Sequence, residues 1–260
     1  MRIAITREVS NSIGQCELTH LSRQEIDVNL ARYQHAQYEN ILRDLGCTVR
    51  RLSDEPNLPD SVFVEDTAIV LDDTAVITRP GVFLRRDETQ SIAEVLKEYR
   101  TIDQITDPGT LDGGDVLQVG KTLFVGDSIR SNIAGIKQLM EIVAPYGYEV
   151  EVVKVEACLH LKSAVTLAGE GTLLINRFWV EANSFGAMEF IDVDPGEPYA
   201  ANALLVGDEL VYPASFPLTR LRLESEGIKV RAVDVSELQK AEGALTCCSL
   251  IFDEKGETYV

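Results

Sequence analysis

Apolar residues in the first fifty positions follow two spacings, one typical of strands and one typical of helices. Short apolar runs at residues 2–6 and 47–52 predict two strands. Between them, residues 27–45 carry apolar side chains at helical intervals, with Asp27 as the predicted N-cap and Gly46 as the stop. Residues 10–25 show no clear period and predict a polar loop. The chain therefore begins with strand, loop, helix and strand.

From residue 62 onward one unit recurs. Each copy has two apolar runs joined by a short polar turn, then a helical pattern, then a third apolar run. The hairpins open near residues 66, 115, 163, 202 and 247, which lie 39 to 49 residues apart. Repeats of about this length are typical of propellers and solenoids. The pattern therefore predicts a strand-strand-helix-strand unit in five copies.

Two copies depart from this unit. Residues 176–192 leave little room for a helix before the third strand of their copy. The last hairpin begins at Cys247, is predicted to turn through residues 253–256, and has no helix after it. We expect the N-terminal helix at 27–45 to replace the missing one, so that the chain ends close a ring without exposed sheet edges. The predicted fold is an α/β propeller of five blades, built as a single domain over residues 1–260.

Composition narrows the class of protein and its partners. Hydrophobic residues make up 45% of the chain and charged residues 25%, as is usual for a soluble globular protein. The formal net charge of -18 repels phosphate backbones, so a small cation is a better partner than nucleic acid. No apolar run reaches the length of a membrane span, and the first residues resemble a strand rather than a signal peptide. Five cysteines without a C-x-x-C pair favour neither a disulfide framework nor a zinc ribbon, so we expect the reducing cytoplasm.

The start of each hairpin occupies an equivalent position in its copy, so these residues should converge on the axis of the propeller. Many of them carry groups that can do chemistry. They are Glu65, Asp66, Asp112, Asp115, His160, Ser163, Asn202, Cys247 and Cys248.

A cysteine, a histidine and an acid from separate hairpins can form a nucleophile, its proton partner and an orienting group. Cys247, His160 and Asp112 are the candidates. A free thiol is only a few per cent thiolate at neutral pH, so either the His160 imidazolium or a cationic substrate has to activate it. Two alternatives stay open: Cys247 as a small buried hydrophobe, and zinc on Cys158 and His160, for which two further ligands at suitable spacing are absent from the sequence.

Acids and arginines near the hairpin starts indicate the type of ligand. Asp60, Glu65 and Asp66 would be costly in an enclosed cavity without a cation, and a guanidinium matches carboxylates in bidentate fashion. Arg85 and Arg130 follow the first two hairpins and suit a carboxylate, although arginines are more often surface ion-pair residues. Together they predict a site for an amino acid with a cationic tail.

Six motifs, in order along essentially the whole chain, resemble the dimethylarginine dimethylaminohydrolase family of the pentein superfamily. They are Leu-Pro-Asp-x-Val-Phe-Val-Glu-Asp (58–66), Ile-Thr-Arg-Pro-Gly (77–81), Leu-Asp-Gly-Gly-Asp-Val-Leu (111–117), Phe-Val-Gly-x-Ser-x-Arg-x-Asn (124–132), His-Leu-Lys-Ser (160–163) and Leu-Thr-Cys-Cys-Ser (245–249). The resemblance implies a five-bladed α/β propeller. It also implies hydrolysis of N-omega-methylated arginines to citrulline and a methylamine, without metal or organic cofactor.

The resemblance also implies a role for each matching residue. Cys247 would be the nucleophile, His160 the general acid and base, and Asp112 its acidic partner. The substrate would be bound by the backbone oxygens of Leu18 and Ala241 and by Asp60, Phe63, Glu65, Asp66, Arg85 and Arg130. Within this set, Glu65 and Asp66 would hold the guanidinium and the two arginines the α-carboxylate. The loop at 10–25 would act as a lid.

Two other functions remain as alternatives. One is a deiminase acting on arginine or another small guanidino compound, and the other is a non-catalytic propeller that binds an amino acid. The related arginine deiminases carry an additional helical domain, for which 260 residues leave no room. The expected partner is a small molecule rather than a membrane or nucleic acid, and a homodimer is left open.

Overall fold

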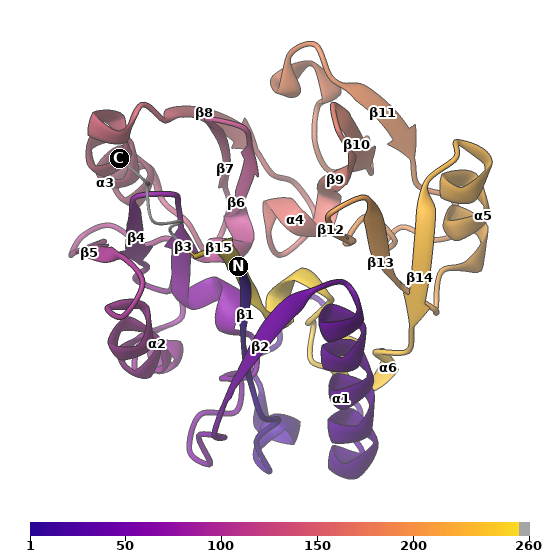
Figure 1. Ribbon diagram of the computed structural model, residues 1–260, viewed down its shortest axis with the longest axis horizontal. Coiled ribbons are helices and arrows are strands. Elements are labelled where there is room, and N and C mark those ends of the chain that lie inside the picture. The colour runs from indigo at the N-terminus through magenta and orange to yellow at the C-terminus, as the bar shows by residue number, and fades with distance from the viewer. Residues whose placement is uncertain (255–260) are drawn as a thin grey trace.

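The computed structural model describes residues 1–254 and contains five three-stranded sheets arranged around a common centre (Figure 1). The strands are β1 (Arg2–Arg7), β2 (Cys47–Leu52) and β15 (Leu250–Asp253) in one sheet; β3 (Ala68–Val70), β4 (Thr74–Ile77) and β5 (Thr101–Gln104); β6 (Val116–Val119), β7 (Thr122–Asp127) and β8 (Glu149–Lys154); β9 (Val165–Gly169), β10 (Thr172–Ile175) and β11 (Glu189–Asp192); and β12 (Leu204–Val206), β13 (Glu209–Pro213) and β14 (Lys229–Val233). The helices are α1 (Val28–Asp44), α2 (Glu88–Leu96), α3 (Ile133–Val143), α4 (Leu161–Ala164), α5 (Pro217–Ser225) and α6 (Ser236–Gln239).

Four of the sheets follow the predicted unit of an antiparallel hairpin and a parallel third strand. In the first of them, β3 pairs antiparallel with β4, and β4 pairs parallel with β5 after the chain has passed through α2. A parallel pair needs such a crossover because its strands run in the same direction. The five three-stranded sheets confirm the predicted five-fold repeat, and four of them are built as the predicted unit.

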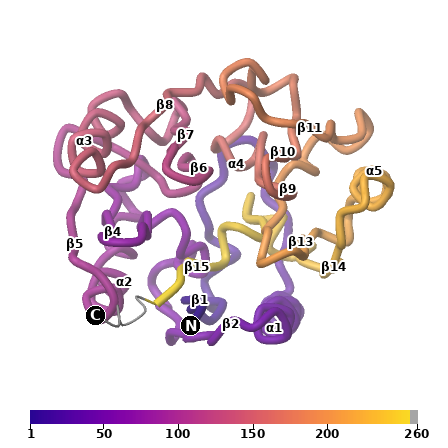
Figure 2. Tube along the Cα trace, turned by 45° about the horizontal axis from the view of Figure 1, so that its top comes forward, coloured from indigo at the N-terminus to yellow at the C-terminus, as the bar shows by residue number. Residues whose placement is uncertain are grey.

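The fifth sheet joins the two ends of the chain. β15 pairs antiparallel with β1, with Arg2 opposite Asp253, and β1 pairs parallel with β2 after α1 (Figure 2). The side chain of Asp27 accepts hydrogen bonds from two backbone N–H groups at the start of α1, and Gly46 adopts a φ of +86° just beyond its end, as predicted. β15 therefore pairs with the N-terminal strand instead of with a strand after a turn. Asp253, predicted to begin that turn, is the last residue of β15, and residues 255–256 of the predicted turn lie outside the described residues.

One blade lacks its helix, as the short segment at 176–192 predicted. Between β10 and β11 the chain forms a 3₁₀ turn at Ala182–Phe185. Phe185 is buried against Phe124 of the preceding sheet, with ring centroids 5.1 Å apart. An aromatic side chain thus fills part of the space that a helix fills in the other blades.

Five apolar clusters hold the sheets together, and each cluster spans two neighbouring sheets. Ile5 of β1 packs with Ile77 of β4 and Ile92 of α2, for example. The cluster around Leu42 of α1 includes Val211 of β13, so the last sheet contacts the first. One cavity is lined by residues from the first hairpin strand of every sheet, β3, β6, β9, β12 and β15. The sheets therefore form a ring around a central axis, with these five strands innermost. Among residues 1–254, no helix has the length and apolar character to span a bilayer.

Candidate active site

The site is built from the turns that precede the innermost strands. These turns are η2 (Val64–Thr67), η4 (Gly113–Asp115), α4 and η7 (Thr246–Cys248). η2 contacts both η7 and η4, and η4 contacts α4. Asn202, just before β12, bonds to Thr246 of η7 through both its amide nitrogen and its amide oxygen. The five hairpin starts therefore meet near the axis, as their equivalent positions predicted.

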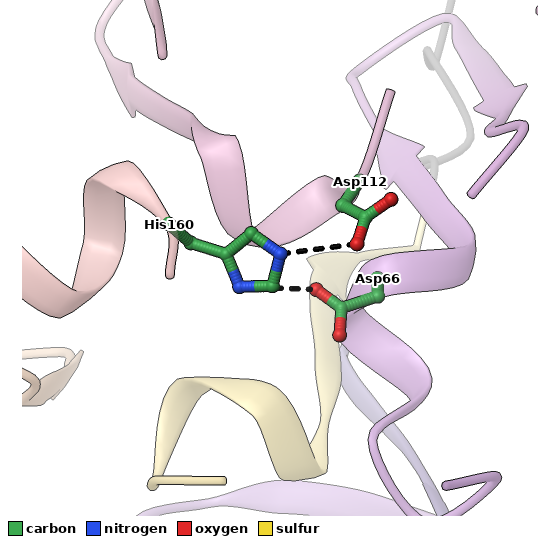
Figure 3. A group of neighbouring side chains, drawn as sticks. All are labelled: Asp66, Asp112 and His160. Atoms are coloured by element: carbon green, nitrogen blue, oxygen red, sulfur yellow. Dashed lines mark hydrogen bonds and ion pairs between the residues drawn. The ribbon is translucent and has the colours of Figure 1, made fainter. Parts of the chain in front are cut away.

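His160 lies between two buried carboxylates. Its Nε2 donates to Oδ2 of Asp112 over 3.0 Å, and its Nδ1 lies 4.0 Å from Oδ1 of Asp66 (Figure 3). Burial alone would lower the pKa of His160, but the charges of Asp66, Asp112 and Asp115 outweigh it and raise the pKa to about 9. The ring is therefore an imidazolium at neutral pH.

Two consecutive glycines allow these groups to approach one another. A Cβ atom on Gly114 would lie 2.7 Å from Nδ1 of His160 and 2.8 Å from Oδ1 of Asp66. A Cβ atom on Gly113 would lie 1.9 Å from the carbonyl oxygen of Glu65. The Asp-Gly-Gly-Asp motif thus brings η4 against η2 and His160.

The second aspartate of that motif was expected near the axis but was given no role, and it positions the segment that carries His160. Asp115 is fully buried and accepts from the backbone N–H of Leu161 over 2.9 Å. It also accepts from the hydroxyls of Ser128 and Ser131, each over 2.6 Å. Burial raises the pKa of Asp115 to about 6. Its place in the motif was the signal that could have identified it.

Cys247 lies in η7 and is half-buried. It lines the same cavity as His160. Burial and the charges of Glu65 and Asp66 raise the pKa of the Cys247 thiol to about 12. In the free protein, a neutral thiol therefore faces the same space as a cationic imidazolium.

This cavity has an empty volume of about 280 Å³ and collects most of the predicted site residues. Those that line it are Asp60, Phe63, Asp66, Arg85, Arg130, His160, Ala241 and Cys247. Glu17, Leu159, Glu242 and Gly243 line it as well and were not predicted. Asp112 lies behind His160, and its Oδ1 accepts from the backbone N–H of Gly81.

The two arginines differ in how far their charges are satisfied. The Arg85 guanidinium donates to Asp66 over 2.7 Å and to Glu88 over 2.9 Å. Arg130 donates through Nη2 to the Thr19 hydroxyl, while its buried Nη1 has no hydrogen-bond partner among the described residues. This Nη1 lies 3.8 Å from Oδ2 of Asp112, beyond hydrogen-bond distance, so it can still donate to an anionic group such as a carboxylate in the cavity.

Comparison with known proteins assigns the chain to a family. The arginine deiminase family model matches residues 55–203. An N(G),N(G)-dimethylarginine dimethylaminohydrolase of Streptomyces coelicolor is 38% identical over 95% of this chain and 95% of its own. The corresponding enzyme of Pseudomonas aeruginosa is 34% identical over 87% of this chain and 90% of its own. The chain belongs to the dimethylarginine dimethylaminohydrolase family.

Solved structures agree with this assignment. A cysteine-to-serine mutant of the P. aeruginosa dimethylarginine dimethylaminohydrolase, complexed with citrulline, superposes with a TM-score of 0.91 at 33% identity. The match covers 96% of this chain and 98% of that one. The N-terminal domain of a cyanobacterial arginine dihydrolase superposes with a TM-score of 0.88 at 20% identity, which shows a shared fold.

Glu65 does not line the cavity of Cys247 in this member of the dimethylarginine dimethylaminohydrolase family. One carboxylate oxygen of Glu65 is bonded to Nζ of Lys162, and the other accepts from the hydroxyl of Thr246 over 2.7 Å. Burial raises the pKa of Glu65, with Lys162 acting in the opposite direction. Glu65 and Lys162 instead line the cavity between the innermost strands.

The loop predicted as a lid is tied to the site at several points. The N–H of Glu17 donates to Asp60 over 3.0 Å. Leu18 is partly buried against the cluster around α1 and stands between Glu17 and Thr19, whose hydroxyl is bonded to Arg130. Of the two other histidines in the sequence, His20 in this loop is exposed and His35 on α1 is buried.

Asp66, Asp112 and His160 form a group that could in principle hold a metal ion, because their ligand atoms lie within 4.8 Å of one another. Asp66 is already bonded to Arg85 and to the backbone N–H of Gly114. The charges of His160 and Arg85 outweigh the effect of burial and lower the pKa of Asp66 to about 2. Because the carboxylates are already neutralised by protein cations, the donor set fits an acid–base group better than a metal centre.

Proposed function

We propose that this protein hydrolyses N-omega,N-omega-dimethylarginine and monomethylarginine to citrulline and dimethylamine or methylamine. The observation that supports it is the meeting, in one small cavity, of the Cys247 thiol, the His160 imidazolium and the Arg130 guanidinium. These supply a nucleophile, an acid and an anchor for a carboxylate. Membership in the dimethylarginine dimethylaminohydrolase family supports the same reaction.

In this proposal the substrate lies between Arg130 and Cys247. Its α-carboxylate accepts a hydrogen bond from Nη1 of Arg130, which makes no other hydrogen bond among the described residues, and Asp60 lies near its amino group. Asp66 faces the guanidinium. Glu65 does not line the cavity and acts indirectly, through the hydrogen bond that it accepts from the Thr246 hydroxyl in η7. Asp60, whose carboxylate accepts from the N–H of Glu17 and forms no ion pair among the described residues, favours a substrate with a cationic amino group over a neutral one.

The charge state of the free site indicates how the thiol becomes reactive. The His160 cation is surrounded by Asp66, Asp112 and Asp115, so little of its charge is left to stabilise a thiolate. A guanidinium placed beside Cys247 supplies that charge, and the thiol proton leaves to solvent as substrate binds. The substrate is thus the activating cation.

The reaction then proceeds in two halves. The thiolate of Cys247 bonds to the guanidinium carbon, the carbon–nitrogen bond to dimethylamine breaks, and that nitrogen takes the proton of His160. This leaves an S-alkylthiouronium intermediate. Neutral His160 next takes a proton from water as the water oxygen bonds to the same carbon. The carbon–sulfur bond breaks, the sulfur recovers a proton, and citrulline is released.

Two structures of dimethylarginine dimethylaminohydrolases support these assignments. One is the cysteine-to-serine mutant of the P. aeruginosa enzyme with citrulline, and the other is a histidine-to-glycine variant of a dimethylarginine dimethylaminohydrolase as an adduct with S-methyl-L-thiocitrulline. We propose that Cys247 and His160 are the equivalent residues here. A reducing compartment accords with the five free cysteines of the described chain.

The test measures citrulline release from dimethylarginine and from L-arginine in parallel, for the native protein and for Cys247→Ser. We expect turnover of the methylated substrate and a loss of at least about 10³-fold in the variant. Cys47→Ala, at the start of β2, is the control and should retain activity. Faster release from plain arginine would assign the protein to the deiminases, and binding without turnover of either would leave an amino-acid-binding propeller.

A further inference from the structure

Glu242 holds the loop that covers the cavity. Its carboxylate accepts three consecutive backbone N–H groups of that loop: from Thr19 over 2.9 Å on Oε2, and from His20 and Leu21 over 2.5 Å each on Oε1. Consecutive N–H groups that converge on one anion form a backbone nest, and hydrogen bonds to a charged acceptor are stronger than neutral ones. One side chain thus fixes three residues of the loop.

The backbone of Glu242 adopts a conformation that a glutamate does not prefer. Its φ is +57°, in the left-handed region, where glycine or asparagine is usual after a helix. It follows α6 and donates its N–H to the carbonyl oxygen of Gln239. The next residue, Gly243, packs against Phe63, whose ring lies 2.1 Å from where a Cβ atom would be. A strained glutamate at the wall of a cavity points to a role for its side chain.

The other anchors of this loop are residues to which the proposed function assigns the amino-acid end of the substrate. Asp60 accepts from the N–H of Glu17, and Arg130 donates to the hydroxyl of Thr19. Glu242 is different because its carboxylate is bonded to the loop and is assigned no part of the substrate. It lines the cavity of Cys247 and also the adjoining cavity that His20 and Leu21 line.

We propose that Glu242 is a positioning residue that latches residues 19–21 over the bound substrate, and so sets substrate affinity without taking part in the chemistry at Cys247. The inference rests on the proposed function. A closed loop excludes water and holds the substrate between Asp60 and Arg130. Without the latch, part of the substrate's binding energy has to be used to order the loop, which raises KM.

The first test compares Glu242→Gln and Glu242→Gly with the native enzyme. We expect KM for dimethylarginine to rise about tenfold or more in Glu242→Gly, while kcat stays within about twofold. Glu242→Gln should show a smaller rise, because one amide oxygen can still accept from His20 and Leu21. The control is Glu226→Gln, which removes the same charge from an exposed position at the end of α5 and should leave KM unchanged.

Glycine relieves the left-handed strain at position 242, so the melting temperature of Glu242→Gly should not fall. A rise in KM without loss of stability therefore separates a latch from a structural role. A fall in kcat at unchanged KM would overturn the proposal, because it would place Glu242 in the chemistry. Unchanged kinetic constants in both variants would overturn it as well.

A second readout does not depend on activity. Arg23 is exposed in the same loop and is held by the carbonyl oxygens of Gly14 and Cys16, so trypsin cleavage after Arg23 reports on the order of the loop. We expect cleavage, identified by fragment mass, to be about tenfold faster in Glu242→Gly than in the native protein or Glu226→Gln. Equal rates would contradict the latch even if the protein hydrolyses methylarginine. Faster cleavage would support it even if methylarginine is not the substrate.

Discussion

The two ends of the central axis have opposite chemical character, although both take residues from the segments that lead into β3, β9 and β15. At one end, the turns before the innermost strands contribute His160, Asp66 and Cys247 to a small polar cavity. At the other end, the strands themselves line a cavity with apolar side chains such as Leu117 and Ile251. Glu65 and Lys162 line this second cavity and not the first.

The difference follows from how each segment uses its backbone. In the strands, the N–H and C=O groups are paired within the sheet, and the side chains pack in layers. In the turns, N–H groups stay free to orient side chains, as when Gly114 donates to Asp66 and Leu161 donates to Asp115. A rigid ring of sheets thus holds irregular turns in fixed places, and the chemistry gathers where the strands begin.

Replacing the acid that orients His160 should have the largest effect on the polar end. For Asp112→Asn, we expect kcat to fall about 10²-fold or more, because His160 loses a charged partner. The pKa of His160 is raised to about 9, so the imidazolium is present below that pH and is lost above it. Activity that needs His160 as an acid should therefore decline above about pH 9 in the native protein.

In Asp112→Asn, one source of that raised pKa is gone, so the alkaline decline should move to lower pH. Profiles of kcat against pH check this, with Asp127→Asn at an exposed position on β7 as the control. An unmoved alkaline limb in Asp112→Asn would mean that the limb reports a group other than His160.

Breaking the ion pair between Glu65 and Lys162 should mainly lower the free energy of unfolding. Lys162→Met leaves the Glu65 carboxylate buried without its cation, and we expect about 3 kcal/mol less free energy of unfolding. Glu65→Gln combined with Lys162→Met should recover part of that loss, because neither charge is then buried alone. Urea unfolding of both single variants and the double variant measures the coupling. Strictly additive losses would show that the two side chains do not depend on each other.

A change at the apolar end should have the smallest effect. Gln118 on β6 lines the far cavity and donates to the carbonyl oxygen of Gly120. For Gln118→Ala, we expect kcat/KM within about twofold of the native value and stability within about 0.5 kcal/mol. Steady-state kinetics and thermal melting provide the check. A tenfold fall in kcat/KM would show that the far cavity is coupled to the site.

Most of the architecture could be predicted because it repeats. Five similar patterns fix the number of blades and place Glu65, Asp112, His160 and Cys247 at equivalent positions, so their convergence follows from the period alone. The pairing of β15 with β1 was harder to foresee in detail, since it joins residues 251 positions apart, such as Arg2 and Asp253. The pattern indicated that the ends close the ring, but it did not identify the partner strand.

Details of the site depended on contacts that one sequence does not encode locally. Glu65 and Lys162 are 97 positions apart, so nothing near Glu65 showed that its charge is already matched. Glu242 reaches a loop more than 220 positions away and lies in a segment without a clear pattern. Residue types and repeats predict which functional groups lie near the axis. Which hydrogen-bond donor or cation pairs with each carboxylate can be read only from the three-dimensional structure.

The most direct test of the central claim is to trap the covalent intermediate. His160→Gly removes the base that activates water. Cys247 should therefore displace methanethiol from S-methyl-L-thiocitrulline, and the resulting S-alkylthiouronium adduct should persist because it is not hydrolysed. Intact-protein mass followed by peptide mapping locates it. The account predicts one adduct, on Cys247, and none when Cys247→Ser is added to His160→Gly. No adduct, or an adduct on Cys158 or Cys248, would contradict it.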